Sequence, residues 1–316
     1  MKFSGRSETS AGQRSDMTEN TTFKPIHSLR SGTRPYCRDR TEQWTLLAAS
    51  GRLFEISVSL PKAPAPIAGF PVLYVLDPST AFATLADVVR NHERMFGPAI
   101  VVGIGYSTEA EIANRAFDMS PPTDRDTLPN CLPNGWGAVG GADVFLDFLL
   151  SELRPKLAEL FAIDPVRQAL LGHSLGGLFA LHALFTRSSA FDTYVAASPS
   201  IWWGNKVILK SLPAFKAEQM KRTGQRKLLV VLGEREDELT PEESRAAAAM
   251  NLINIKLLLD EAKMRDNATA LMAELRPLQS YGLQSAYVEF PQETHNSVIP
   301  AYLSRGARFA LQGWYG

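Results

Sequence analysis

The sequence is poor in cysteine, in net charge and in long apolar runs. Its 316 residues include only two cysteines, Cys37 and Cys131. Two are too few for the disulfide framework of a small secreted domain, and their spacing is not that of metal ligands. We therefore expect two free thiols, and we expect neither a metal nor a cofactor.

The charges of the chain balance. Lysine plus arginine number 33 and aspartate plus glutamate number 33, so no global field draws the chain to nucleic acid or to an anionic membrane surface. The polar first 22 residues are not followed by an apolar run of signal-peptide or membrane-spanning length. We predict a cytoplasmic protein with a small-molecule partner, and a disordered tail over residues 1–22.

Short apolar runs alternate with longer helical patterns along the rest of the chain. This alternation is typical of a mainly parallel sheet with helices on both faces. Ser50-Gly51 predicts an antiparallel hairpin at the N-terminal edge of that sheet. Residues 23–316 are expected to form a single α/β domain with a helical insertion around 241–280, which is either a crossover packed on the sheet or a lid. The predicted strands lie near Trp44–Leu47, Leu53–Leu60, Val72–Leu76, Ala99–Ile104, Ala169–Leu171, Thr193–Ala197, Lys227–Leu232 and Ala286–Phe290, and the helices near 140–161, 174–187, 241–278 and 298–311.

The strongest chemical signal is the G-x-S-x-G pattern Gly172-His173-Ser174-Leu175-Gly176. It lies between an apolar run and a helical pattern, as a strand, a sharp turn and a helix require. Such a turn strains the backbone at the serine, so we expect any larger side chain at 172 or 176 to collide with neighbouring backbone. Ser174 is the predicted nucleophile.

A serine hydroxyl is a poor nucleophile at neutral pH and needs a base. His295 follows the last predicted strand, in agreement with the chain order serine, acid, histidine, and is the predicted base. The other histidines, His27, His92, His173 and His182, are expected at packing or surface positions.

The acid is expected after a strand between the serine and the histidine. Glu236 lies three residues beyond Gly233, where the turn has room to bring the carboxylate back toward His295. It is the preferred acid, and Asp237 and Glu234 remain alternatives.

Oxyanion stabilisation needs two backbone N–H donors, one of them from the residue after the nucleophile. Leu175 supplies the first, and Ser79 in the predicted loop 77–80 is expected to supply the second, because Pro78 has no N–H.

Trp202 and Trp203 follow another predicted strand, and either form a stacking wall for an aromatic substrate or pack in the core.

In these residues the chain resembles the putative-esterase family of α/β-hydrolases, which includes enterochelin (enterobactin) esterases and related siderophore-trilactone hydrolases. The resemblance covers roughly residues 40 to 315 and implies a cofactor-free serine esterase of the α/β-hydrolase fold. Pro78 departs from the glycine that is usual at this position. Beyond the serine and histidine patterns, the resemblance rests on Val72–Asp77, Val101–Tyr106, Asn114-Arg115, Asp118, Ser120–Pro122, Gly140–Asp143 and Ala197–Trp203.

The resemblance implies an acyl-enzyme on Ser174 that water releases, with Arg115 among the substrate contacts and a catecholate trilactone among the substrates. Three alternatives stay open on the same residues: a feruloyl or acetyl esterase, an acyltransferase, and a non-catalytic ligand-binding protein that retains the fold. The oligomeric state is not predicted.

Overall fold

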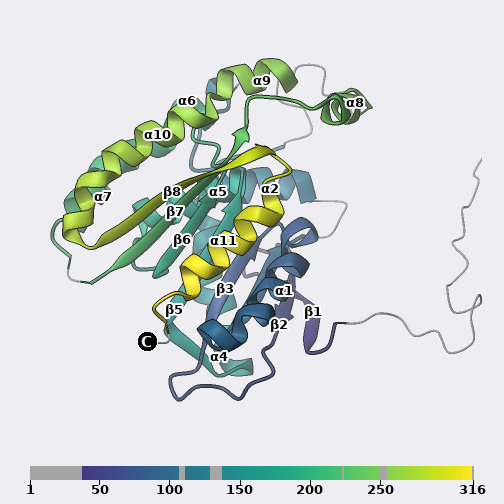
Figure 1. Ribbon diagram of the computed structural model, residues 1–316, viewed down its shortest axis with the longest axis vertical. Coiled ribbons are helices and arrows are strands. Elements are labelled where there is room, and N and C mark those ends of the chain that lie inside the picture. The colour runs from purple at the N-terminus through teal and green to yellow at the C-terminus, as the bar shows by residue number, and fades with distance from the viewer. Residues whose placement is uncertain (1–37, 107–110, 129–136, 223, 250–254, 315–316) are drawn as a thin grey trace, which may run out of the picture. The chain divides into compact units, whose positions relative to one another are not determined.

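Eight strands form one sheet in the computed structural model, which describes residues 38–106, 111–128, 137–222, 224–249 and 255–314. The strand order is β1-β2-β4-β3-β5-β6-β7-β8 (Figure 1). The predicted tail and both cysteines lie outside these residues, and the division into tail and domain stays a prediction. The strands are β1 Thr41–Leu47, β2 Leu53–Ser59, β3 Phe70–Leu76, β4 Ile100–Gly105, β5 Ile163–His173, β6 Thr193–Ala197, β7 Arg226–Arg235 and β8 Leu283–Thr294.

The sheet is parallel except at its N-terminal edge. β1 pairs antiparallel with β2, and β2 pairs antiparallel with β4. The pairs β3–β4, β3–β5, β5–β6, β6–β7 and β7–β8 are all parallel. This arrangement confirms the predicted fold class and all eight predicted strands, of which β5 and β8 extend furthest beyond their predicted ends.

The observed helices match the predicted ones less closely than the strands do. The predicted helix over 140–161 is interrupted by a π-helical turn at Leu149–Leu153, and the segment predicted as the loop 77–80 is instead the start of a 19-residue helix with Pro78 at its first position. The loop interpretation was wrong because proline suits the first turn of a helix as well as a loop. The helices are α1 Pro78–Phe96, α2 Glu111–Met119, α3 Ala142–Phe148, α4 Arg154–Leu160, α5 Leu175–Thr186, α6 Trp203–Lys206, α7 Leu212–Gln219, α8 Pro241–Ala249, α9 Ile255–Ala262, α10 Met264–Leu275 and α11 Ile299–Leu311.

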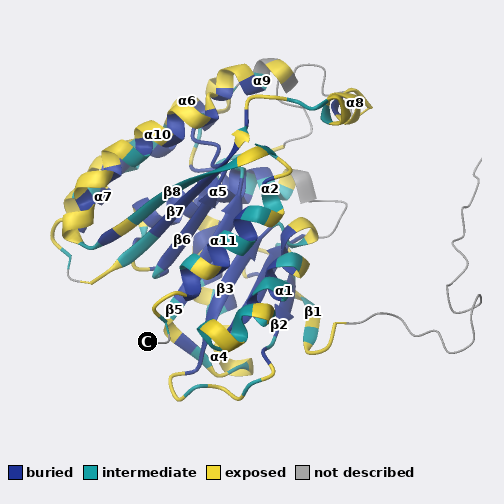
Figure 2. Ribbon diagram, viewed as in Figure 1, coloured by how far each residue is buried: buried dark blue, intermediate teal, exposed yellow. Residues whose placement is uncertain are grey.

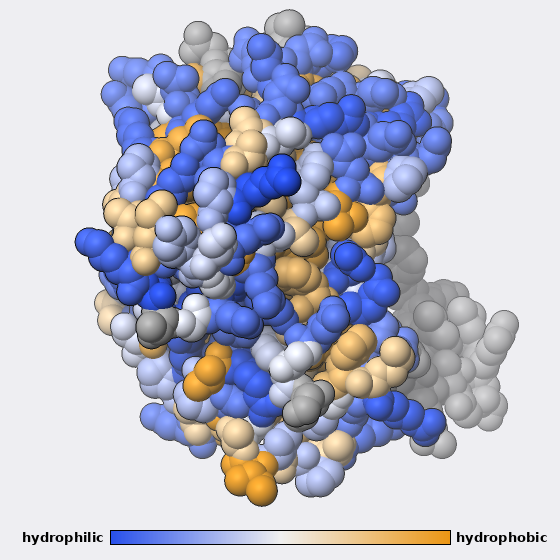
Figure 3. Space-filling view, turned by 60° about the vertical axis from the view of Figure 1, so that its left-hand side comes forward, coloured by the Kyte–Doolittle hydropathy of each residue, from blue (hydrophilic) through white to orange (hydrophobic). Residues whose placement is uncertain are grey.

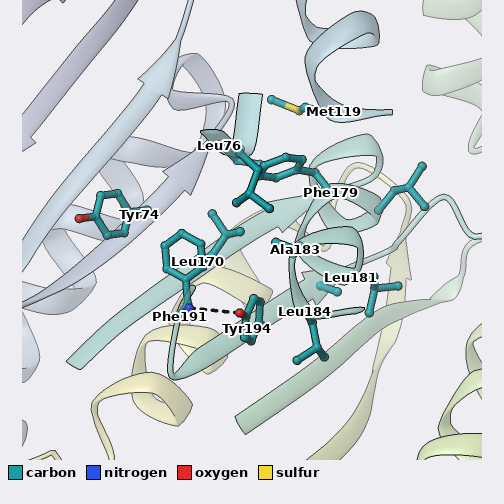
Figure 4. Close-up of a cluster of buried hydrophobic side chains, with 14 of the residues drawn as sticks. Tyr74, Leu76, Met119, Leu170, Phe179, Leu181, Ala183, Leu184, Phe191 and Tyr194 are labelled. Atoms are coloured by element: carbon teal, nitrogen blue, oxygen red, sulfur yellow. Dashed lines mark hydrogen bonds between the residues drawn. The ribbon is translucent and has the colours of Figure 1, made fainter. Parts of the chain in front are cut away.

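Alternate residues of the central strands belong to two separate cores. Leu170 of β5 belongs to the core that α3, α4, α5, α7 and α10 cover, whereas Leu171 faces the core covered by α1 and α11. Successive side chains of a strand point to opposite faces, so a continuous apolar run is needed where both faces are covered. Figure 2 shows the resulting buried band through the sheet. Figure 4 shows side chains of the first core, with Leu76 of β3 beside Phe179 of α5.

The segment between β7 and β8 divides into parts with different packing. α10 buries Met264, Ala268 and Leu271 in the first core, as a crossover helix does. α8 has a single buried residue, Ala247. Its N-terminus is a capping box, in which Glu243 N donates to Thr240 Oγ1 at 3.1 Å and Thr240 N donates to Glu243 Oε2 at 2.9 Å. Movement of this segment as a lid stays a prediction.

Polar residues dominate the molecular face in Figure 3, with apolar ones in small scattered groups. Among the described residues, none of the helices has both the length and the apolar composition needed to cross a bilayer. The cytoplasmic location stays a prediction.

The turn from β5 into α5 has the strained geometry that its glycines predict. Ser174 has φ 59° and ψ −115°. A Cβ atom at Gly172 would lie 2.2 Å from the carbonyl oxygen of Gly176, so the expected collision is confirmed there. At Gly176 the expectation was wrong, because a Cβ atom would meet the Leu76 side chain at 3.4 Å, an ordinary contact. The next backbone collision is at Gly177, where a Cβ atom would lie 2.6 Å from the Ala197 carbonyl oxygen.

These contacts predict opposite outcomes for two alanine substitutions in one turn. Gly172→Ala forces backbone to move and lowers the free energy of unfolding by more than about 4 kcal/mol, or prevents folding. Gly176→Ala lies in α5, where alanine is the better helix former by about 1 kcal/mol, and leaves stability unchanged or slightly higher. Urea unfolding followed by circular dichroism measures both; equal stability of the two variants would contradict the geometry.

Candidate active site

Five parallel strands that are neighbours in the sheet each end directly before a polar residue. Asp77 follows β3, Ser174 follows β5, Ser198 follows β6, Glu236 follows β7 and His295 follows β8. Carboxyl ends of parallel strands meet at one edge of a sheet, where α/β proteins place their ligand sites. Residues far apart in the sequence are therefore gathered along one edge.

Three of these residues have a left-handed backbone, which is unusual outside glycine. The φ angles are 56° at Asp77, 59° at Ser174 and 42° at Ser198. Such a residue costs about 1–3 kcal/mol and persists where its surroundings fix it. Here Ser174 N donates to the Ala197 carbonyl at 2.9 Å and Ser198 N donates to the Val231 carbonyl at 2.7 Å. The turns at Ser174 and Ser198 are thus each hydrogen-bonded to the next strand along the sheet.

Ser174 is half-buried at the start of α5, which has no side-chain cap. Its Oγ lies 3.4 Å from Ser200 Oγ. Within the described residues this is the hydrogen-bonding contact of the Ser174 hydroxyl, and His295 is not its partner. The hydroxyl is therefore turned toward β6, while the imidazole stands at the end of β8.

The predicted acid and base form a direct pair. His295 Nδ1 lies 2.7 Å from Glu236 Oε2, and the other carboxylate oxygen accepts hydrogen bonds from Gly233 N at 2.9 Å and from Ser198 Oγ. Burial raises the pKa of Glu236, but the hydrogen bonds from His295, Ser198 and Gly233 outweigh it, and the pKa lies below its usual value. An ionised Glu236 accepts from Nδ1–H, which leaves Nε2 of His295 as the acceptor of a proton.

The two alternative acids have other partners. Glu234 Oε2 accepts from Gln292 N at 2.9 Å. Burial raises the pKa of Asp237, whose carboxylate accepts from the backbone N–H of Met264. Of the three carboxylates considered from the sequence, Glu236 is the one hydrogen-bonded to His295.

His173 contacts His295, the predicted base. It packs, as expected, but its packing partner is His295 itself, with ring centroids 4.6 Å apart. Its Nε2 lies 2.7 Å from the His295 carbonyl oxygen. Burial, together with the nearby charges of His295 and Arg115, holds the pKa of His173 well below its usual value. A neutral His173 must carry its proton on Nε2 to donate to that carbonyl.

Arg115 is engaged inside the protein. Its Nε and Nη2 donate to the Asp77 carboxylate at 2.7 and 3.0 Å, and Nη2 also lies 3.2 Å from the His173 carbonyl oxygen. A bidentate arginine fixes a carboxylate in both position and plane. Arg115 thus ties Asp77 to the residue before Ser174, and its predicted contact with a substrate stays a prediction.

The two predicted oxyanion donors belong to helices that start at the same edge. Leu175 is the first residue of α5, and Ser79 lies in the first turn of α1. β3 and β5, which precede these helices, are parallel neighbours. Pro78 packs over the glycines of β4, since a Cβ atom at Gly105 would lie 2.6 Å from its ring. The donor roles stay predictions.

The adjacent tryptophans have different surroundings. Trp203 is fully buried in the core, so the stacking-wall interpretation was wrong for this residue. Trp202 is partly exposed and lines a cavity of about 330 Å³ together with Thr127, Asn205 and Glu261. Adjacent positions in the sequence do not reveal which of the two rings is buried, because the start of α6 lies between them and their side chains have different surroundings.

Two serines at this edge were missed by the sequence analysis. Ser198 contacts Glu236 and Ser200 contacts Ser174. The available signal was the position of Ser198 directly after the parallel strand β6, with Ser200 two residues further on. Within the described residues, no cluster of three or more potential ligand side chains is arranged to hold a metal ion.

Comparison with known proteins identifies the family of the chain. A family model described as "Putative esterase" matches residues 48–270. The chain is 36% identical over 268 residues to ferri-bacillibactin esterase BesA of Bacillus subtilis. The alignment covers 82% of this chain and 85% of the relative. It is 34% identical over 264 residues to the siderophore triacetylfusarinine C esterase of Aspergillus fumigatus, covering 77% and 82% of the two chains.

The fold agrees as well. The structure superposes on siderophore hydrolase EstB from Aspergillus nidulans with a TM-score of 0.73 at 31% identity, covering 89% of this chain and 99% of that one. The α/β-hydrolase fold predicted from the sequence is thereby confirmed. The chain belongs to the "Putative esterase" family, and it is a serine esterase.

Proposed function

We propose that this esterase hydrolyses ester bonds of a siderophore, with Ser174 as nucleophile, His295 as base and Glu236 as acid. The observation that carries the catalytic assignment is the 2.7 Å hydrogen bond between His295 Nδ1 and the buried Glu236 carboxylate, at the strand edge where the elbow presents Ser174. The names of two relatives, a ferri-bacillibactin esterase and a triacetylfusarinine C esterase, support the substrate class.

The reaction starts with a rotation of the Ser174 side chain from Ser200 toward His295. Nε2 of His295 takes the hydroxyl proton while Oγ attacks the ester carbonyl, and Glu236 stabilises the imidazolium that forms. The backbone N–H groups of Leu175 and Ser79 receive the oxyanion. His295 then protonates the leaving alcohol, and water releases the acyl group by the same steps in reverse order.

The cavity beside Trp202 supports an aromatic substrate arm. Its volume of about 330 Å³ is at the lower end of the range for small-molecule sites. A partly exposed indole face stacks well on another ring. We propose that one arm of a larger ester lies here while its ester carbonyl reaches Ser174.

The nucleophile and base are expected to act as one unit. Ser174→Ala and His295→Ala each lower kcat by about 10⁴- to 10⁶-fold, and the double variant is no worse than either single one. Hydrolysis of p-nitrophenyl acetate measures turnover, and a fluorophosphonate probe followed by mass spectrometry locates the labelled serine. Labelling that persists in Ser174→Ala, or a double variant with multiplied losses, would contradict the assignment.

Glu236→Gln is expected to lower kcat/KM by about 10²- to 10⁴-fold, because an amide supports the wrong tautomer of the base. A neutral partner also stabilises the imidazolium less, so the acid limb of the kcat/KM profile moves to lower pH. Glu234→Gln and Asp237→Asn serve as matched controls with near-normal rates. If one of these controls loses activity while Glu236→Gln keeps it, the acid is assigned wrongly.

The substrate class is tested with p-nitrophenyl esters of graded acyl length beside a ferric catecholate trilactone. We expect kcat/KM to be at least tenfold higher for the trilactone than for the p-nitrophenyl esters. Trp202→Ala is expected to lower kcat/KM for the trilactone but not for the acetyl ester, because stacking of an aromatic ring on the indole contributes about 1 kcal/mol. Equal rates on acetyl and trilactone esters would argue against a siderophore. Transfer of the acyl group to an added alcohol in preference to water would indicate an acyltransferase.

A further inference from the structure

We propose that the tripeptide Ser198-Pro199-Ser200 is a positioning segment that sets the acid with one hydroxyl and the nucleophile with the other. The proposal rests on the catalytic roles given above to Ser174, His295 and Glu236. It assigns functions to Ser198 and Ser200 that neither the G-x-S-x-G pattern nor the triad includes.

Ser198 fixes the acid. Its side chain is fully buried, and its hydroxyl donates to Glu236 Oε1, the oxygen that does not face His295. The backbone N–H of Gly233 donates to the same oxygen at 2.9 Å. Two donors on one oxygen hold the plane of the carboxylate, so that Oε2 stays directed at His295 Nδ1. The Ser198 hydroxyl also draws charge from the carboxylate that supports the base.

Ser200 contacts the reacting atom of the nucleophile. It is 2% exposed, and its Oγ lies 3.4 Å from Ser174 Oγ. Its backbone N–H donates to the Ser174 carbonyl oxygen at 3.2 Å. A hydroxyl that donates to Ser174 Oγ leaves the Ser174 proton free to be given to His295. Ser200 thereby holds the nucleophile in one orientation before the reaction, from which a single rotation brings its hydroxyl to His295.

The backbone between these serines fits a rigid connector. Ser198 N donates to Val231 of β7, the strand that leads to the acid, and Ser200 N donates to Ser174. Pro199 fixes the φ angle between them. It also lies against the elbow helix, since a Cβ atom at Gly177 would come within 3.1 Å of Pro199 Cα. A shift of either serine is therefore transmitted to the other, and the acid and the nucleophile keep a set relation.

Ser198→Ala tests the action on the acid. Loss of a hydrogen bond to a charged group lowers kcat/KM about tenfold. The carboxylate left with fewer donors stabilises the imidazolium more, so the acid limb of the kcat/KM profile moves to higher pH, opposite to Glu236→Gln. A purely structural role of Ser198 would change the rate without this shift.

Ser200→Ala tests the action on the nucleophile. We expect kcat and the rate of fluorophosphonate labelling to fall together by about tenfold, with KM and the acid limb of the pH profile unchanged. A rise in KM with normal kcat would assign Ser200 to substrate binding instead and overturn its positioning role.

Ser188→Ala is the matched control. Ser188 is also a buried serine that donates to a glutamate, Glu218, but it lies outside the active-site edge. All three variants are compared by their unfolding midpoints. If Ser198→Ala and Ser200→Ala fold and retain the rate and pH profile of the Ser188→Ala protein, the positioning segment is refuted, while labelling of Ser174 still supports the triad. If labelling of Ser174 is also absent, the proposed function fails instead.

Discussion

The site depends on one constraint, the common end of parallel strands. Each of five neighbouring strands stops directly before a polar residue, so five separate stretches of chain deliver one side chain each to the same edge. Backbone hydrogen bonds hold the strands in register, and apolar helices cover both faces. The edge is where the regular pairing ends and side chains become free to face a ligand. The positions of these side chains are therefore fixed by the sheet and not by the loops.

Charge at this edge is balanced pair by pair. Glu236 is buried and would be costly as an isolated carboxylate, but His295, Ser198 and Gly233 all hydrogen-bond to it. Asp77 lies beside the elbow, where negative charge develops in the proposed mechanism, and a bidentate contact with Arg115 offsets the charge of Asp77. Without Arg115, the Asp77 carboxylate would oppose the oxyanion. The arginine therefore has an electrostatic function even where it touches no ligand.

Sequence reasoning succeeded where a local pattern has one physical meaning. Alternating apolar runs gave eight strands, and the glycines around Ser174 gave the elbow. The order of segments led to Glu236 and His295, which the structure brings together at 2.7 Å. Sequence reasoning failed where the same local pattern occurs in two different structural environments. Pro78 begins a helix as readily as it forms a loop, and adjacent Trp202 and Trp203 differ only in the tertiary contacts that bury the second ring.

His173 and His295 are in contact, and the proposed mechanism uses only His295 as a base. If His173 were charged, its repulsion would oppose the imidazolium that the proposed mechanism forms on His295, because their ring centroids are 4.6 Å apart. Burial keeps the pKa of His173 well below its usual value, and its Nε2–H is committed to the His295 carbonyl. His295 is instead partly exposed and paired with a carboxylate. The two imidazoles thus differ in environment: His173 is buried, neutral and hydrogen-bonded to the His295 backbone, whereas His295 keeps Nε2 for the proton transfer that we propose.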